Sequence, residues 1–277
     1  MILEKAPRVA IYIPPGFRPW DDAVTLAFTY ADIPFTAIWD EEVLSGGLND
    51  YDWLHLHHED FTGQYGKFYA SYRNADWYQA QVRTYETQAR TLGFKKVSEE
   101  KKAVVEAIRD WVARGGFLFA MCSATDSFDI ALAARGIDIC APEYDGDPAD
   151  QEANRKLDFS RTLAFAGFSL IMNPYQYEFS NIDMTALSLG RGEANDYFTL
   201  FEFSAKQDPV PTMLTQDHTN VVKGFLGQTT SFNRRMLKDG VLVLGEPEGA
   251  EDVRYIHGSF GRGTFTWTST GCPSATP

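Results

Sequence analysis

The chain has 277 residues, and its 25 basic and 38 acidic side chains give a formal net charge of −13. This acidic balance argues against nucleic acid and anionic membranes as partners, and no apolar run approaches the length of a membrane span. Cys122, Cys140 and Cys272 are too few and too far apart to imply a disulfide framework. We therefore expect a cytoplasmic protein with a small-molecule partner, and export followed by removal of a signal peptide is the open alternative.

The first sixty residues predict the opening of a doubly wound α/β sheet. A first strand is expected over 8–13, and Asp21 or Asp22 is expected to cap the helix that follows. Second and third strands are expected over 35–39 and 51–57. In open parallel sheets ligands bind beyond the carboxyl ends of the strands, so the polar residues after the third strand lie at the expected site.

A segment rich in aromatic side chains, 61–97, is predicted to be an insertion in this sheet. Its first part has the composition of a loop folded over the sheet edge, and its second part, from Asp76, has helical spacing. A long ordered loop in a compact domain is commonly a lid or a binding element. Ser98 is expected to cap the amphipathic helix that follows, and Gly115 to end it.

The stretch 115–134 has the pattern of a nucleophile elbow. A short apolar strand, 117–121, leads directly into Cys122, and a new helix follows. The tight turn between strand and helix needs small neighbouring side chains, and Ala120 and Ala124 supply them.

The position of Cys122 makes it the predicted nucleophile. A helix N-terminus favours thiolate over thiol and points free N–H groups at the substrate. The backbone N–H groups of 122–124 are the expected oxyanion donors, with Ser123 and Ala124 as substrate-binding residues. The alternative is that Cys122 is a small buried apolar residue, as most free cysteines are.

The second half of the chain predicts antiparallel strands near the C-terminus. No clean period is present over 157–203, and no internal repeat or linker is evident, so we predict one domain over the whole chain. Strands are expected over 136–140, 212–215 and 241–245, and as a hairpin of 253–257 with 263–268.

Taken together, these features resemble the class I glutamine amidotransferase-like superfamily, which includes glutaminases, DJ-1/PfpI proteins and ThuA-like proteins. The resemblance rests on the Cys122 elbow, on the third strand that ends in His57-His58-Glu59-Asp60, and on the segment 241–268, which is most similar to ThuA-like proteins. It extends to a bacterial subfamily labelled asparagine synthetase B. The resemblance implies a flavodoxin-like, doubly wound, mostly parallel sheet with a C-terminal antiparallel strand pair.

The chain departs from the family pattern after the last strand. A glutaminase of this superfamily has a histidine there, with a glutamate two residues on, whereas 268–277 contains neither. The catalytic base is then absent, supplied from elsewhere, or missing because the end of the chain is truncated or altered.

Histidines elsewhere in the chain are candidate bases. His58, with Glu59 to orient it, lies at the tip of the third strand, and His218 is a second candidate. For the pair of His57 and His58 a catalytic and a structural role are equally open. The side chains expected to contact substrate at this edge are His57, Asp60 and Tyr65.

Metal binding has weak support in the sequence. His55 and His57 lie on one face of a strand, as in some zinc sites, but nothing fixes a third ligand. The loop 145–150 lacks the full calcium-binding pattern, so a solvated acidic loop is the better interpretation. We predict neither a metal nor a cofactor.

Two functions remain open from the sequence. The first is a cysteine-nucleophile hydrolase or amidotransferase acting on an amide or a related small substrate. The second is a catalytically inactive ThuA-like domain that recognises a sugar through the 61–78 loop, because sugar faces stack on aromatic rings while carboxylates bind hydroxyls. The same rings would otherwise pack the lid onto the domain or form a homodimer contact.

Overall fold

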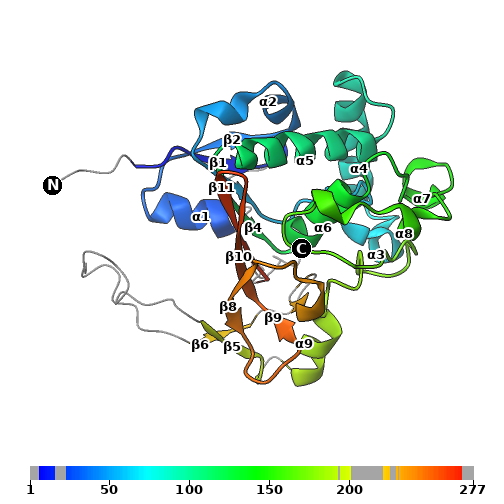
Figure 1. The fold of residues 1–277 in the computed structure, drawn as a ribbon. Coiled ribbons are helices and arrows are strands. Elements are labelled where there is room, and N and C mark those ends of the chain that lie inside the picture. The colour runs from blue at the N-terminus through cyan, green and yellow to red at the C-terminus, as the bar shows by residue number, and fades with distance from the viewer. Residues whose placement is uncertain are drawn as a thin grey trace.

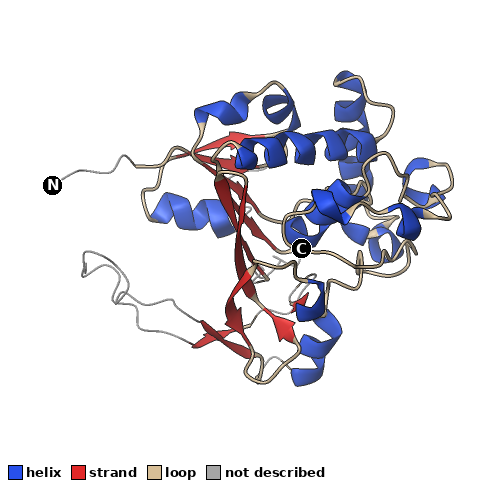
Figure 2. Cartoon of the chain, in the orientation of Figure 1, coloured by secondary structure: helices blue, strands red, loops and turns tan. Residues whose placement is uncertain are grey.

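A nine-stranded sheet runs through the part of the chain that the computed structural model describes, residues 6–15, 23–192, 194–200, 221–224, 229 and 231–269 (Figures 1 and 2). Half of the sheet is parallel. When these parallel strands are numbered along the chain, their spatial order is 2-1-3-4-5, as in flavodoxin-like sheets. The predicted α/β class is therefore confirmed. These strands are β2 (Phe35–Ile38), β1 (Val9–Tyr12), β3 (Trp53–Leu56), β4 (Phe117–Met121) and β11 (Gly263–Thr268).

The sheet continues beyond β11 as an antiparallel extension. The predicted hairpin is present as β10 (Tyr255–Phe260) paired with β11, and β8 (Leu242–Glu246) pairs with β10. β5 (Tyr197–Leu200) and β6 (Val221–Lys223) complete it, so the extension is larger than the predicted pair. β7 (Phe232–Asn233) and β9 (Asp252–Val253) form a separate small ladder.

The strand predicted over 136–140 is wrong, because its backbone bonds to a loop and not to a neighbouring strand. The Asp138 carboxylate accepts the N–H of Cys140 at 3.0 Å, and the Asp138 carbonyl accepts the N–H of Asp150 at 2.9 Å. The strand predicted over 212–215 lies outside the described residues.

Helices cover both faces of the parallel strands, as a doubly wound sheet requires (Figure 1). On one face Phe28 of α1 (Ala23–Tyr30) packs edge-on against Trp53, with ring centroids 5.5 Å apart. On the other face α5 (Val97–Ala113) and α6 (Ser123–Ala133) form the main core with the strands, through fully buried side chains such as Ile108 and Phe128. Burial of this apolar area is the main stabilising contribution.

The aromatic insertion folds as one short and one long helix with a small core of their own. α3 (Tyr69–Tyr72) and α4 (Asp76–Thr91) lie in it, and Tyr65 and Tyr78 are buried beside Cys140 and Tyr144. α5 begins at Val97, one residue before the predicted cap, with Lys96 as its N-cap. The remaining helices are α2 (Asp40–Leu44), α7 (Pro142–Asp145), α8 (Ala153–Lys156) and α9 (Thr185–Arg191).

A buried ion network holds the antiparallel extension to α9. The Arg254 guanidinium is fully buried and donates to Asp196 at 2.6 Å and to Ser188 at 2.8 Å. Arg191 on α9 bonds to Asp196 at 2.8 Å and to Asp252 at 2.7 Å. Each buried carboxylate here has its own cation, which offsets the cost of removing both charges from water.

A second buried cluster lies at the carboxyl ends of β1 and β2. Lys101 of α5 donates to Asp40 at 2.6 Å and to the Tyr12 hydroxyl at 3.1 Å, and its ammonium lies 3.9 Å from the centre of a Trp39 ring. Glu100 is buried next to this group, where burial and the neighbouring Asp40 carboxylate raise its pKa to about 8.

The raised pKa of Glu100 predicts a pH-dependent stability. Glu100 ionises near pH 4.5 in the unfolded chain but near pH 8 in the folded one, so the free energy of unfolding falls as pH rises between these values. Glu100→Gln removes this ionisation, and we expect it to stabilise the protein by roughly 1–3 kcal/mol at pH 8, with little gain at pH 5. Urea denaturation at both pH values measures this.

The matched control for this prediction is Glu41→Gln, an exposed glutamate on α2. Its urea midpoints should follow the unmodified protein at both pH values. A Glu100→Gln variant that is equally or less stable than the unmodified protein at pH 8 would contradict the buried, protonated state of Glu100.

Candidate functional site

Cys122 lies between β4 and α6 in a strained backbone conformation. Its φ and ψ are 52° and −140°, in a region that non-glycine residues rarely adopt. The Cys122 N–H donates to the Thr268 carbonyl of β11 at 3.3 Å, and its carbonyl accepts the Thr125 hydroxyl at 2.6 Å. Ala120 and Ala124 on either side are fully buried. The turn therefore has the strand, strained residue and helix of an elbow.

The chain that leaves β3 lies against the start of α6. The hydroxyl of Ser123 donates to the His58 carbonyl at 2.9 Å, and that of Ser127 donates to the Glu59 carbonyl at 3.1 Å. Ser127 also accepts the Phe61 N–H at 3.3 Å. The structure thus brings the predicted residues after β3 to the Cys122 edge.

The two histidines of this loop stack on one another. The ring centroids of His57 and His58 are 3.5 Å apart, and the His57 ring is buried whereas His58 is exposed. The Glu59 carboxylate accepts the His57 backbone N–H at 2.6 Å, which fixes the turn after the strand. His218 lies outside the described residues.

Asp60 orders the loop that begins the insertion. Its two carboxylate oxygens accept the N–H groups of Thr62, Gln64 and Gly66 at 2.7–2.9 Å, and also the Thr62 hydroxyl. Burial raises the pKa of Asp60 even though these bonds act in the opposite direction. This carboxylate is already engaged by the loop itself, so the predicted contact of Asp60 with substrate stays a prediction.

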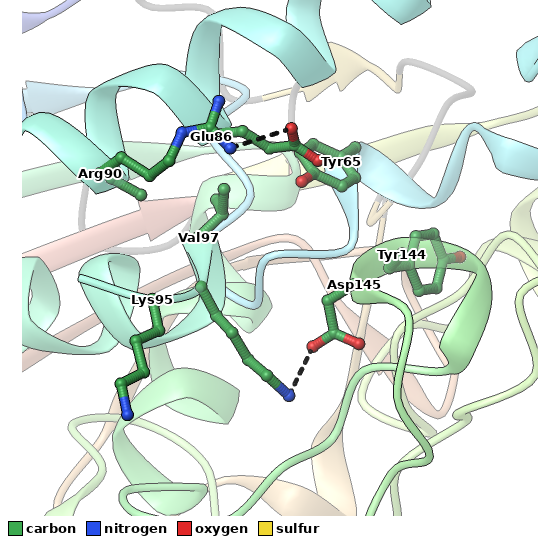
Figure 3. Close-up of a pocket in the computed structure, with 9 residues that line it drawn as sticks. Tyr65, Glu86, Arg90, Lys95, Val97, Tyr144 and Asp145 are labelled. Carbon is green, nitrogen blue, oxygen red and sulfur yellow. Dashed lines mark ion pairs between the residues drawn. The ribbon is translucent and has the colours of Figure 1, made fainter.

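Tyr65 lies in a cavity of about 210 Å³ that the insertion forms with α5 and α7 (Figure 3). Glu86 and Arg90 of α4 form an ion pair at 3.6 Å beside the Tyr65 ring, and Lys96 pairs with Asp145 at 3.1 Å among the residues that line the same cavity. Burial and the nearby Glu86 carboxylate raise the pKa of Tyr65. The contact between Tyr65 and substrate therefore stays a prediction, and this cavity is where it would form.

In the described part of the chain, one group of side chains that could ligate a metal lies close together: Asp138, Cys140 and Asp145. The Lys96 ammonium already bonds to Asp138 at 2.5 Å and to Asp145 at 3.1 Å, and it also pairs with Asp147. A lysine thus supplies the positive charge that a metal would bring. The acidic loop that the sequence suggested to be solvated is held in place by this lysine.

Two carboxyl groups that the sequence analysis missed lie beside Cys122. Thr229 links them, since its hydroxyl donates to Asp126 Oδ1 at 3.1 Å and its N–H donates to Asp183 Oδ2 at 2.7 Å. Asp126 is fully buried, one helical turn after Cys122, and its Oδ2 has no hydrogen-bond partner within the described residues. The available signal was the presence of two acidic side chains, Asp126 and Asp129, in the helix that follows the elbow.

Burial of this site determines its protonation. It raises the pKa of Asp126 well above the usual range, with a further contribution from Asp183, and it raises the pKa of Asp183 to about 6. It also raises the pKa of the Cys122 thiol to about 12, and the two carboxylates add to this shift. The expectation that the helix N-terminus would favour thiolate is therefore corrected, because desolvation and two nearby acids outweigh the Ser123 N–H that stabilises the sulfur.

Exposed aromatic rings adjoin this site. Burial raises the pKa of Tyr177, and the charges of Cys122 and Asp183 add to this shift. Its ring lies 6.0 Å from that of Phe68, which in turn lies 6.0 Å from both Tyr72 and Trp77. Tyr72, Trp77 and Tyr177 are each more than 40% exposed, and we call these three residues with Phe68 the aromatic rim.

The comparisons with known proteins describe the fold alone. The chain matches no protein-family model, and no curated protein matches it. It is similar to a cytoplasmic protein from Salmonella typhimurium LT2, with 11% identity, a TM-score of 0.46, and coverage of 96% of this chain and 89% of that one. A second cytoplasmic protein from Salmonella typhimurium has 10% identity, a TM-score of 0.44, and coverage of 96% and 88%.

A GH42 beta-galactosidase from G. stearothermophilus is also similar, with 11% identity, a TM-score of 0.41, and coverage of 95% of this chain and 27% of that one. All three TM-scores lie below 0.5, so the fold assignment depends on the strand order of the sheet. None of the helices in the described ranges is long and apolar enough to cross a membrane.

The pKa of Cys122 predicts a slow reaction with alkylating reagents. In a Cys140→Ser, Cys272→Ser background, we expect iodoacetamide to modify Cys122 more than tenfold more slowly at pH 8 than a free thiol, whose pKa is about 8.5. The rate should rise only above about pH 10, because desolvation and two nearby acids disfavour the thiolate. Mass spectrometry of the modified protein over this pH range gives the titration curve, and a thiolate that titrates at or below pH 8.5 would contradict the prediction.

Proposed function

We propose that this protein is a small-molecule binding domain on a glutamine amidotransferase-like fold, and that its ligand is a carbohydrate held between the aromatic rim and the Cys122 edge of the sheet. The observation that carries the proposal is the exposed aromatic rim, in which the rings of Tyr72, Trp77 and Tyr177 each lie about 6 Å from that of Phe68. Exposed rings that adjoin one another are uncommon on a soluble domain and mark a binding surface. Beside carboxyl groups, they suit a ligand with apolar faces and many hydroxyl groups.

The protonation of Cys122 favours binding over catalysis by a thiolate. A cysteine nucleophile must be ionised, and a base or a cation beside it normally stabilises that state. In this protein the groups that face the thiol include Asp126 and Asp183, which act in the opposite direction. The proposed protein is therefore catalytically inactive and similar to the ThuA-like group.

The backbone of the elbow favours a second candidate function, a cysteine hydrolase acting on an amide. The strained conformation of Cys122, and the Ser123 N–H that donates to its sulfur, are features that such enzymes use. In this alternative His58 is the base and Glu59 the orienting group. Release of ammonia from glutamine or asparagine by the unmodified protein, and its loss in the Cys122→Ser variant, would support this alternative. Absence of release by the unmodified protein would exclude this amide chemistry.

Carbohydrate binding is tested with soluble oligosaccharide tetramers, by isothermal titration and tryptophan fluorescence. We expect Trp77→Ala and Tyr177→Ala each to weaken binding roughly tenfold, equivalent to about 1.4 kcal/mol, because each removes an exposed stacking surface. Tyr197→Ala is the matched control, since this tyrosine of β5 is similarly exposed but lies on the antiparallel extension.

The fold of each variant is checked by its unfolding midpoint, which should stay unchanged because all three side chains are partly in solvent. Failure of every oligosaccharide tetramer to bind with a Kd tighter than about 1 mM would overturn the proposed function. Equal losses in Tyr197→Ala would show that the aromatic rim is not the binding surface.

A further inference from the structure

One end of the nine-stranded sheet is an open strand edge. The sheet ends at β2 on one side and at β6 on the other (Figure 1). The Ile38 carbonyl accepts the N–H of Ile13, the residue after β1, at 2.9 Å. Because successive residues of a strand direct their backbone groups to opposite sides, the N–H and C=O groups of Phe35 and Ala37 face away from β1. In the part of the chain that the structure describes, no strand pairs with that side of β2.

This edge lacks the features by which proteins usually prevent association between strands. Protected edges are commonly very short, twisted by a bulge, or lined by charged residues or proline. β2 has the sequence Phe-Thr-Ala-Ile and pairs with β1 in one continuous register, and its Thr36 and Ala37 are exposed. At the other end of the sheet, β6 has three residues, one of which is Lys223. β2 is therefore the end of the sheet that is open to pairing with another strand.

An apolar surface adjoins this edge. α1 contains no charged side chain, which is unusual for a helix at the surface. Phe28 of α1 packs against Phe35 of β2 with ring centroids 6.1 Å apart, so the helix and the strand form one surface. Tyr30 is 84% exposed, and Leu26 and Ile33 are 40% and 37% exposed. We call these three exposed residues together with β2 the β2 face.

The β2 face carries little charge. The chain has a formal net charge of −13, and repulsion between like charges opposes contact between two copies. The segment 23–38, which contains the β2 face, has Asp32 as its one charged residue. Two copies can therefore meet at this face with few like charges opposed, and without the removal of many charged groups from water.

We propose that the β2 face is the interface of a homodimer, in which the β2 strands of two copies pair antiparallel about a two-fold axis next to Thr36. In this register Phe35 of each copy lies opposite Ala37 of the other, and each such pair exchanges both of its N–H···O bonds. Thr36 lies opposite Thr36 of the other copy, at a position without hydrogen bonds between the strands. A second copy fits the edge because it offers the same outward backbone groups at the same spacing, beside the same apolar side chains.

This interface is independent of the proposed carbohydrate binding. Tyr72 and Trp77 of the aromatic rim belong to the insertion, whose helices α3 and α4 lie on the other side of the molecule from α1 (Figure 1). It is also a different surface from the homodimer contact that the sequence suggested for the aromatic insertion. Failure of either proposal therefore leaves the other in place.

The association is tested by sedimentation velocity of the full chain over a range of concentrations. We expect a dimer with a Kd tighter than about 100 μM. Tyr30→Glu places a charge on the apolar part of the face, and Ala37→Pro removes an outward N–H while keeping the groups that bond to β1. Each should weaken the dimer at least tenfold. Trp77→Glu is the matched control, because this exposed aromatic residue lies on α4, and its dimer should match that of the unmodified protein.

The register of the strands is tested by a disulfide between copies. Residues directly opposite at a position without hydrogen bonds have Cα atoms about 4.5 Å apart, which is within the range of a disulfide. In a Cys140→Ser, Cys272→Ser background, we expect oxidised glutathione to convert most of the Thr36→Cys variant to a covalent dimer. Thr87→Cys is the control, since Thr87 is an exposed threonine of α4, and it should remain monomeric on a denaturing gel.

Three results would overturn the inference. The first is an unmodified protein that stays monomeric up to about 200 μM. The second is a dimer that neither Tyr30→Glu nor Ala37→Pro weakens, or one that Trp77→Glu dissociates, since association then uses another surface. The third is a Thr36→Cys variant that forms no more covalent dimer than Thr87→Cys. The unfolding midpoint of each variant, measured at a concentration well below the Kd, confirms that its monomer is folded, and Tyr30→Glu alone suffices if Ala37→Pro does not fold.

Discussion

The position of β4 between β3 and β11 is the constraint on which the site depends. Leu56 at the end of β3 is in register with Ala120, and Thr268 at the end of β11 is in register with Met121. Both neighbouring strands therefore end within two residues of Cys122, and the chain segments that follow them flank the elbow. The two serine hydroxyls of α6 then hold the segment after β3 against the first two turns of the helix. Parallel pairing thus assembles an edge from segments more than sixty residues apart.

Desolvation controls the chemistry of this edge more strongly than the helix dipole does. A helix N-terminus contributes a partial positive charge worth about 0.3–1 kcal/mol at an exposed position. Removing a thiol and two carboxyl groups from water costs more, and the pKa values of Cys122, Asp126 and Asp183 all move upward as a result. The same burial elsewhere in the chain is accompanied by a lysine or arginine, as for Asp40 and Asp196. Among the described residues neither Asp126 nor Asp183 has such an ion pair, whereas the buried Lys67 ammonium acts on Asp60 and Glu178.

The aromatic insertion has some of its rings in a buried core and others on the surface. Tyr65 and Tyr78 are buried and form a small core with the 140–144 segment, whereas Tyr72 and Trp77 face solvent next to Tyr177. The sequence offered packing and sugar binding as alternatives for the same rings, and the structure shows packing for the buried ones and leaves the exposed ones for the proposed binding. Tyr177 comes from a segment about a hundred residues later, so the rim exists only in the folded chain.

The sequence by itself determined the parallel strands, the closing hairpin and the two long helices before the elbow. Short apolar runs between turn signals predicted the parallel strands and the closing hairpin, and amphipathic spacing predicted a helix from Asp76 and another between Ser98 and Gly115, which are α4 and α5. The strand-to-helix turn at Cys122 was also predictable, because its signals lie within twenty residues. These features are local, so the residues that encode them are neighbours in the chain.

Only the tertiary structure decided what surrounds the thiol. Asp183 and Thr229 come from segments without a clear period, and Asp126 is hidden in an apolar helix, so no spacing rule brings them to Cys122. The pKa of the thiol was predicted in the wrong direction for the same reason, since burial and neighbouring charge depend on contacts between distant segments. The prediction of a strand over 136–140 was wrong for the same reason, because the backbone of this segment bonds to a loop and to the Asp138 side chain.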